Sequence, residues 1–312
     1  MTGHQPARRR GRDRVVDLSV VIVAGDRAAP PTETIASLAA QDHPGPIETV
    51  VVWTGPGPAP AVTVDDPHRP VRVVDDQQRG RSAALNRGAA AADGAVLGFG
   101  DVHDRWLPSR ARRQLDLLAD LGASVVSSGV TVVDGHRVRD LPGVDGVVRY
   151  VDLLHGHDPE ASPSTALVRT DAFRGGIGPF DELVGGGVEG EEWMLRAARR
   201  GPIPVASEPL VRRDRTAGVD VDRRWADREA GLRRLLALNP DVARDPTARA
   251  RLEARIALAV AAQRRRREAL RQVREALRWS WWEPRSIAAL AVAAGVPADR
   301  VASALHRRGR SW

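Results

Sequence analysis

The 312-residue chain contains no cysteine, which excludes disulfides, a thiolate metal site and a cysteine nucleophile. Lysine is also absent, since all 47 basic residues are arginine, and this excludes Schiff-base chemistry and a phosphate-loop lysine. Aromatic residues make up only 4% of the chain, and eight of them are tryptophan. Apolar residues account for 42%, which is enough to bury a core. The chain can therefore form a globular core, but it has no cysteine or lysine chemistry.

No apolar run approaches the roughly 18 residues of a transmembrane helix. The apolar run at 18–24 lies between Asp17 and Asp26, so it predicts a buried strand rather than a signal sequence. We expect a cytoplasmic protein, with peripheral contact at the inner face of the membrane as the alternative.

The positive charge lies almost entirely in the last third of the chain. Residues 1–222 hold 26 arginines and 31 acidic residues, a net charge of −5. Residues 223–312 hold 21 arginines and 9 acidic residues, a net charge of +12. Such asymmetry indicates either a solvated helical face, which we favour, or an anionic partner.

Hydrophobic periodicity predicts alternating strands and helices. Strands are expected at 18–23, 49–53, 71–74 and 95–99, and helices at 32–41, 81–92 and 108–121. Short strands follow at 125–133, 166–168 and 203–212, with a helix at 190–200. This order predicts an α/β fold with a mostly parallel sheet covered on both faces. Ligands bind such sheets at the carboxyl ends of the strands.

The composition divides the chain into three parts. We expect a disordered basic N-terminus at 1–14, an α/β domain at 15–217 and a basic helical region at 218–312. In the last part, 225–238, 248–278 and two short stretches after Pro284 are predicted helices.

The loop after the fourth strand contains the first candidate site. Asp101 and His103 are two residues apart at a strand end, so both side chains can face one cation, Mn²⁺ or Mg²⁺. A helix-capping aspartate is the alternative interpretation. A second candidate metal group is His155 and His157 with Asp158, although loop residues near the acceptor are the favoured interpretation.

A series of motifs in a fixed order resembles family 2 glycosyltransferases. The segments are 18–27, 48–55, 80–88, 99–108, 164–173, 178–182 and 190–196. The resemblance spans about 17–215 and implies a GT-A fold, a Rossmann-like sheet that binds a nucleotide sugar. It also implies transfer with inversion at the anomeric carbon.

The resemblance also implies roles for individual residues. Glu192 would be the catalytic base, and Asp101 and His103 would hold Mn²⁺ or Mg²⁺ at the donor diphosphate. The predicted nucleotide-binding residues are Asp26, Thr54, Gly80, Arg81, Ser82 and Asn86. The residues predicted to line the acceptor or support the site are Asp104, Trp106, Glu191 and Trp193.

Four positions depart from the family's pattern. Thr54 replaces an acidic residue, His103 replaces the last aspartate of the metal motif, Glu192 replaces aspartate, and Thr216 stands where many members have histidine. These changes motivate an alternative function, a catalytically altered or inactive relative that acts as a binding or scaffolding partner.

The C-terminal region combines arginine and tryptophan. Arg264–Arg267 and the pair Trp281 and Trp282 lie in or beside predicted helices. Packing of these helices on the α/β domain is the favoured interpretation, and peripheral contact with an anionic membrane is the second. No nucleic-acid-binding motif is present, so no nucleic acid is expected as a partner. The resemblance implies a nucleotide-sugar donor, UDP- or another NDP-sugar, and an acceptor that the sequence does not specify.

Overall fold

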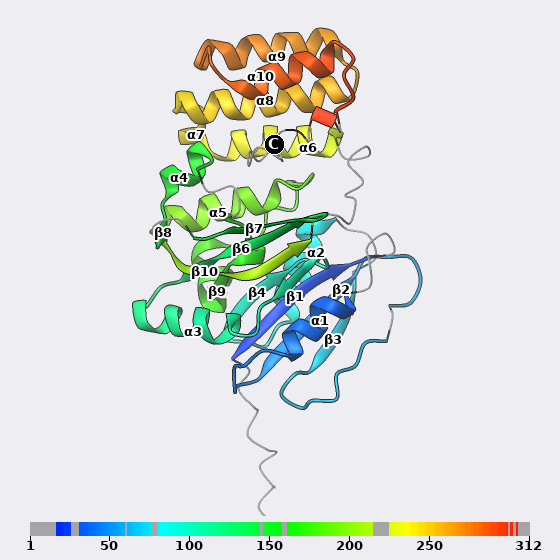
Figure 1. The fold of residues 1–312 in the computed structure, drawn as a ribbon, viewed down its shortest axis with the longest axis vertical. Helices are drawn as coiled ribbons and strands as arrows, with labels where there is room; N and C mark the ends of the chain where they lie inside the picture. Colours follow the sequence, from blue (N-terminus) through cyan, green and yellow to red (C-terminus); the bar gives the residue numbers. More distant parts are fainter. Residues whose placement is uncertain are drawn as a thin grey trace, which may run out of the picture.

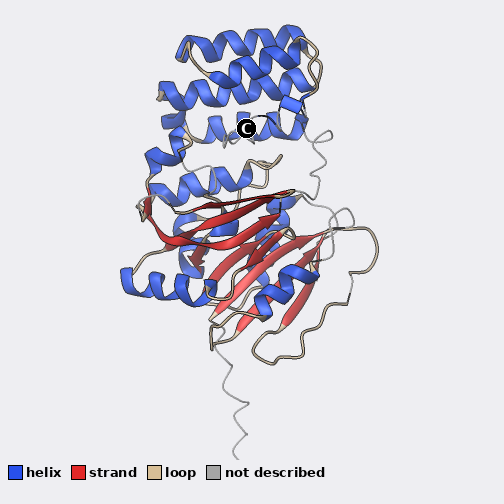
Figure 2. Cartoon of the chain, in the orientation of Figure 1, coloured by secondary structure: helices blue, strands red, loops and turns tan. Residues whose placement is uncertain are grey.

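The structure is a computed structural model that describes residues 17–25, 31–59, 61–76, 80–143, 146–157, 161–214, 225–298, 300–301 and 304. A central mixed sheet occupies one half of the molecule and a stack of helices the other (Figures 1 and 2). The predicted domain boundary near 217 lies outside the described residues.

The first part of the sheet is parallel. Its strands are β1 (Leu18–Ala24), β2 (Ile47–Trp53), β3 (Val71–Asp75) and β4 (Val96–Gly100), in the order β3-β2-β1-β4. All three pairings are parallel, so the strand ends that carry Thr54 and Asp101 lie at one edge. These four strands match the predicted ones to within a residue or two.

The second part of the sheet is mixed. It continues β9-β6-β10-β5, formed by β9 (Leu167–Arg169), β6 (Val125–Asp134), β10 (Ile203–Asp214) and β5 (Asp104–Trp106). Strands β7 (Arg137–Leu141) and β8 (Val147–Val148) pair with β6 and β10 from outside this path. β6 and β10 are parallel, whereas β9 is antiparallel to both of its neighbours. The predicted α/β class is confirmed.

Helices cover both faces of the sheet because successive strand residues point to opposite faces. Val20 and Ile22 pack with α1 (Thr32–Ala39) and α3 (Arg110–Leu121). Val21 packs on the other face with α2 (Arg81–Ala91) and α5 (Glu189–Arg199). A side chain at Gly88 would overlap Val21, so the glycine lets α2 lie close to β1.

Short elements lead into α5 and the C-terminal helices. They are α4 (Tyr150–His155), the 3₁₀ turn η1 (Pro163–Thr165) and the π-helical turn η2 (Ala172–Ile177). The C-terminal helices are α6 (Trp225–Leu238), α7 (Pro240–Arg244), α8 (Pro246–Ala262), α9 (Arg266–Trp279) and α10 (Pro284–Ala293).

The prediction of one continuous helix at 248–278 was wrong. α8 ends at Ala262 and α9 begins at Arg266, because Arg264 adopts a left-handed backbone conformation with φ 62°. The chain therefore reverses inside the arginine run. α8 becomes the centre of the helical part, with nearly all of its residues buried between its neighbours. Among the described residues, none of the helices has both the length and the apolar character needed to cross a bilayer.

Candidate functional site

Predicted site residues lie in the loops at the carboxyl ends of β2 and β4, Thr54 in the first and Asp101 in the second. Thr54 directly follows β2, and its hydroxyl group donates a 3.1 Å hydrogen bond to the carbonyl oxygen of Ala24. Thr54 thus joins the ends of β1 and β2. Asp26, the predicted neighbour of Thr54 at the nucleotide, lies outside the described residues, as do Asp158 and Thr216.

Arg81 joins two carboxylates that are far apart in the sequence. Its Nη2 lies 3.0 Å from Oδ2 of Asp101, and its Nε lies 3.3 Å from Oε1 of Glu189. Arg81 is the first residue of α2, Asp101 follows β4, and Glu189 is the first residue of α5. We call these three residues the Arg81 cluster. It brings one predicted metal ligand and one predicted nucleotide-binding residue together at the sheet edge.

The Arg81 cluster keeps Asp101 ionised. Burial raises the pKa of the Asp101 carboxyl group, but Arg81 and the backbone N–H of His103 lower it by more, so the pKa lies below its usual range. That N–H donates a 3.1 Å hydrogen bond to Oδ1 of Asp101. Asp101 is therefore a carboxylate at neutral pH.

Glu189, which pairs with Arg81, is a residue that the sequence analysis did not single out. Its side chain is 6% exposed, and its Oε2 is buried without a hydrogen-bond partner in the part of the chain that the structure describes. The acid-rich sequence at 189–192 was a signal, but only the structure shows which of its acids pairs with Arg81. The neighbouring Gly190 lies against Pro163, whose Cδ would be 2.9 Å from an added Cβ. Pro163 therefore packs against the backbone of α5 next to Glu189.

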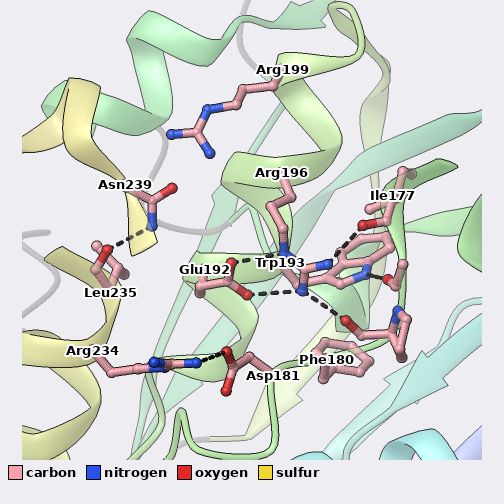
Figure 3. Close-up of polar contacts among 12 residues, drawn as sticks. Ile177, Phe180, Asp181, Glu192, Trp193, Arg196, Arg199, Arg234, Leu235 and Asn239 are labelled. Carbon is pink, nitrogen blue, oxygen red and sulfur yellow. Dashed lines mark hydrogen bonds and ion pairs between the residues drawn. The ribbon is translucent and has the colours of Figure 1, made fainter. Parts of the chain in front are cut away.

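Glu192, the predicted base, pairs with Arg196 one turn further along the same helix (Figure 3). Nε of Arg196 lies 2.7 Å from Oε1 of Glu192, and Nη2 of Arg196 lies 2.9 Å from Oε2. Arg196 also donates hydrogen bonds to the carbonyl oxygens of Ile177 and Pro179. Glu192 is 1% exposed. Both of its oxygens are thus occupied in this structure, and its role as base stays a prediction.

Trp193 belongs to the core next to Glu192. Its ring packs within 6.3 Å of the rings of Phe99, Phe173 and Phe180, measured between centroids. Its Nε1 donates a 3.1 Å hydrogen bond to the carbonyl oxygen of Gly178. Trp193 therefore anchors the helix rather than presenting a surface to a sugar.

Glu191 points to the helical half of the molecule. Arg251 and Arg255, one turn apart on α8, lie 3.1 Å and 2.8 Å from its carboxylate oxygens. Burial alone would raise the pKa of Glu191, but Arg255 and Arg251 lower it to about 2. We call these three residues the Glu191 lock, because they join α5 to α8.

Asp104 and Trp106 follow the loop that contains Asp101 and His103, and both contact arginines. Asp104 is 1% exposed, and its Oδ1 lies 3.0 Å from Nε of Arg213 on β10. The guanidinium group of Arg110 lies 3.6 Å from the centroid of the Trp106 ring. Burial lowers the pKa of Arg110 to about 9. These residues hold the β4–β5 loop on the sheet.

Ser82 and Asn86 attach α2 to the segment before α5. The Ser82 hydroxyl donates a 2.7 Å hydrogen bond to the carbonyl oxygen of Val184. Asn86 donates to the carbonyl oxygen of Phe180 and accepts from the Phe180 N–H, both at 2.9 Å. Gly80, just before α2, has φ 91°, a conformation that favours glycine. The predicted nucleotide-binding residues Gly80 and Arg81 thus lie at the start of α2, and Ser82 and Asn86 face its packing partner.

The comparison with protein families decides the identity of the chain. A family model described as "Glycosyl transferase family 2" matches residues 19–176, about half of the chain. The chain belongs to glycosyl transferase family 2. It is therefore a transferase of the glycosyltransferase type, and the resemblance seen in its motifs is confirmed. A search of curated proteins finds no match.

Solved structures support the fold of this family 2 member. The structure of S. aureus TarS 1–349 in complex with UDP-GlcNAc has a TM-score of 0.62 at 15% identity, covering 95% of this chain and 93% of that one. The UDP complex of the same TarS fragment has a TM-score of 0.54 at 16% identity. Another S. aureus TarS structure matches with a TM-score of 0.56 at 17% identity, and this chain covers 43% of its length. At these identities the likeness is one of fold.

The predicted metal ligands offer a small donor set. Within the described parts of the chain, no group of three or more acidic or histidine side chains is placed to hold a metal ion. Asp101 and His103 supply one carboxylate and one imidazole, and such sites use substrate phosphate oxygens and water as the remaining ligands. The donor set therefore fits Mn²⁺ or Mg²⁺ only together with a diphosphate. His155, from the second candidate group, lies 3.1 Å from Asp245 instead.

Proposed function

We propose that this family 2 glycosyltransferase transfers a sugar from a nucleotide-diphosphate donor to an acceptor hydroxyl group by metal-assisted in-line displacement with inversion. The Arg81 cluster is the observation that carries the proposal. It places the Arg81 guanidinium group and two carboxylates at the edge of the sheet where α/β folds bind nucleotides. The S. aureus TarS complexes with UDP-GlcNAc and UDP support a uridine nucleotide as the first donor to examine.

In the proposed reaction, the acceptor oxygen attacks the anomeric carbon as its proton passes to a carboxylate. The bond between the anomeric carbon and the diphosphate oxygen breaks, and the nucleoside diphosphate leaves with the bonding electron pair. Asp101 and His103 would hold Mn²⁺ or Mg²⁺, which neutralises charge on the departing diphosphate when bound. The guanidinium group of Arg81 and the free N–H groups at the start of α2 would bind the same phosphates.

Two carboxylates are candidates for the base. The resemblance to the family supports Glu192, and the geometry supports Glu189. Glu189 lies in the Arg81 cluster and has one buried oxygen without a partner among the described residues, whereas Arg196 binds both oxygens of Glu192. A base must reach the acceptor proton at hydrogen-bond distance, so we propose Glu189 as the base and Glu192 as the carboxylate that fixes Arg196.

Calorimetry with a donor panel tests this function. Wild-type protein is titrated with UDP, UDP-GlcNAc, GDP and GDP-mannose, with Mn²⁺ and with EDTA. We expect Mn²⁺-dependent binding of one nucleotide class, weakened at least about tenfold by Asp101→Ala, since one lost charged contact costs 1.4 kcal/mol or more. Asp120→Ala, at an exposed position of α3, is the matched control and should bind normally.

Three outcomes separate the alternatives. Mn²⁺-dependent binding with slow donor hydrolysis supports the enzyme. Binding without hydrolysis or transfer to any tested acceptor supports a binding or scaffolding role for the same fold. Absence of binding across the panel by the folded protein contradicts both.

A further inference from the structure

One face of α9 carries a row of exposed arginines. Arg267, Arg271, Arg274 and Arg278 are four, three and four residues apart, so they lie along one side of the helix. Arg267, Arg271 and Arg274 are exposed and have no ion-pair partner among the described residues. The two acids of α9 are already engaged, because Glu268 lies 2.6 Å from Arg265 and Glu275 lies 2.6 Å from Arg278. Arg267, Arg271 and Arg274 therefore form an uncompensated positive strip, and Arg278, which pairs with Glu275, continues it.

Large apolar side chains border the strip. Leu270 and Leu277 are seven residues apart on α9 and are 42% and 37% exposed. Just after α9, Trp281 and Trp282 are 81% and 71% exposed, and their ring centroids are 5.6 Å apart. By contrast, Trp193 of the α/β part is fully buried. Exposed apolar side chains that lie together are typical of a surface that contacts a partner.

The position of this surface separates it from the candidate active site. α9 and α10 form the end of the molecule that is farthest from the sheet (Figure 1). α9 packs inward with the small side chains of Ala269, Val273 and Ala276. The arginine strip and the tryptophans therefore contribute little to packing and are free to contact a partner.

We propose that this surface, formed by Arg267, Leu270, Arg271, Arg274, Leu277, Arg278, Trp281 and Trp282, binds peripherally to an anionic lipid bilayer. Arginines beside exposed leucine and tryptophan are the combination that lets a helix lie in the plane of a membrane interface. The arginines face lipid phosphate and the indole rings enter the headgroup region, where their N–H groups stay hydrated.

Charge selects the lipid surface over a second copy of this chain. Two copies meeting through this face would bring their unpaired arginine strips together, and like charges repel. An anionic bilayer neutralises the strip and buries the tryptophans at the same time. The proposal does not depend on the proposed sugar transfer, because the surface lies outside the Arg81 cluster.

Sedimentation of the full chain with lipid vesicles tests the proposal. We expect binding to vesicles of phosphatidylcholine with phosphatidylglycerol, little binding to phosphatidylcholine alone, and weaker binding at high salt. Trp281→Ala with Trp282→Ala, and separately Arg271→Gln with Arg274→Gln, should each weaken binding about tenfold or more. Arg137→Gln with Arg212→Gln, exposed arginines of the sheet half, is the matched charge control and should not change it.

The replaced residues are exposed, so the variants should keep the wild-type circular dichroism and melting temperature. Wild-type protein that stays in the supernatant with anionic vesicles at low salt would overturn the proposal. So would variants that bind as tightly as wild type. A wild-type dimer seen by light scattering, and broken by Trp281→Ala, would assign the surface to a second copy instead.

Discussion

The two halves of the molecule use arginine in opposite ways at the start of α5. In the Arg81 cluster one arginine serves two carboxylates, and its side chain is 38% exposed. In the Glu191 lock two arginines serve one carboxylate, and their side chains are 5% and 4% exposed. The first arrangement has one more carboxylate than arginine, and its Arg81 and Asp101 side chains are partly exposed. The second is closed and joins two elements.

The helical half contacts α5 and the segment before it. The lock fixes the carboxylate two residues after Glu189. α6 also contacts the segment before α5, because Arg234 lies 2.8 Å from Asp181 and Gly231 lies against the backbone of Gly185. The C-terminal helices thus hold the acid-rich segment in place, while Arg81 and Asp101 stay partly exposed.

The largest expected effect comes from breaking the lock. Glu191→Gln leaves two buried arginines without their carboxylate, so the free energy of unfolding should fall by about 3–5 kcal/mol. Urea denaturation followed by circular dichroism measures this change. The matched control is Glu275→Gln, whose pair with Arg278 is 47% and 73% exposed. That pair should contribute less than about 1 kcal/mol. Equal losses in the two variants would show that the lock does not join the halves.

A smaller effect is expected from acid. Arg255 and Arg251 lower the pKa of Glu191 to about 2 in the folded protein, from 4.5 as the ordinary value. The carboxylate therefore stabilises the fold fully above about pH 4.5, and this contribution is lost as the pH falls towards 2. Below pH 4.5, the stability of wild-type protein should fall more steeply with pH than that of Glu191→Gln, as urea midpoints at successive pH values will show. Parallel curves would contradict the assignment.

The parallel strands could be predicted from the sequence, whereas the break between α8 and α9 could not. β1 to β4 are short β-branched runs, and their hydrophobic pattern is enough to predict the parallel part of the sheet. The break between α8 and α9 was missed because Arg264 lies in a run of arginines with no glycine or proline to mark a turn.

The sequence motifs also identified only some residues of the Arg81 cluster. Motif order placed Asp101 and Arg81 in one site, and the structure brings them together. It did not single out Glu189, because the contact between Glu189 and Arg81 joins residues that are far apart in the sequence. The lock joins residues 60 and 64 positions apart, and no local pattern signals such a pairing.

Donor turnover by Glu189→Gln and Glu192→Gln tests the central claim most directly. Both changes keep the shape of the side chain and remove its charge, and the donor is the sugar nucleotide that calorimetry selects. We predict that Glu189→Gln binds the donor but lowers the rate of hydrolysis about 10²–10⁴-fold, the contribution of a general base. Glu192→Gln should keep hydrolysis within about tenfold of wild type once the folded fraction is matched. The opposite result, an active Glu189→Gln and an inactive but folded Glu192→Gln, would contradict the assignment of the base to the Arg81 cluster.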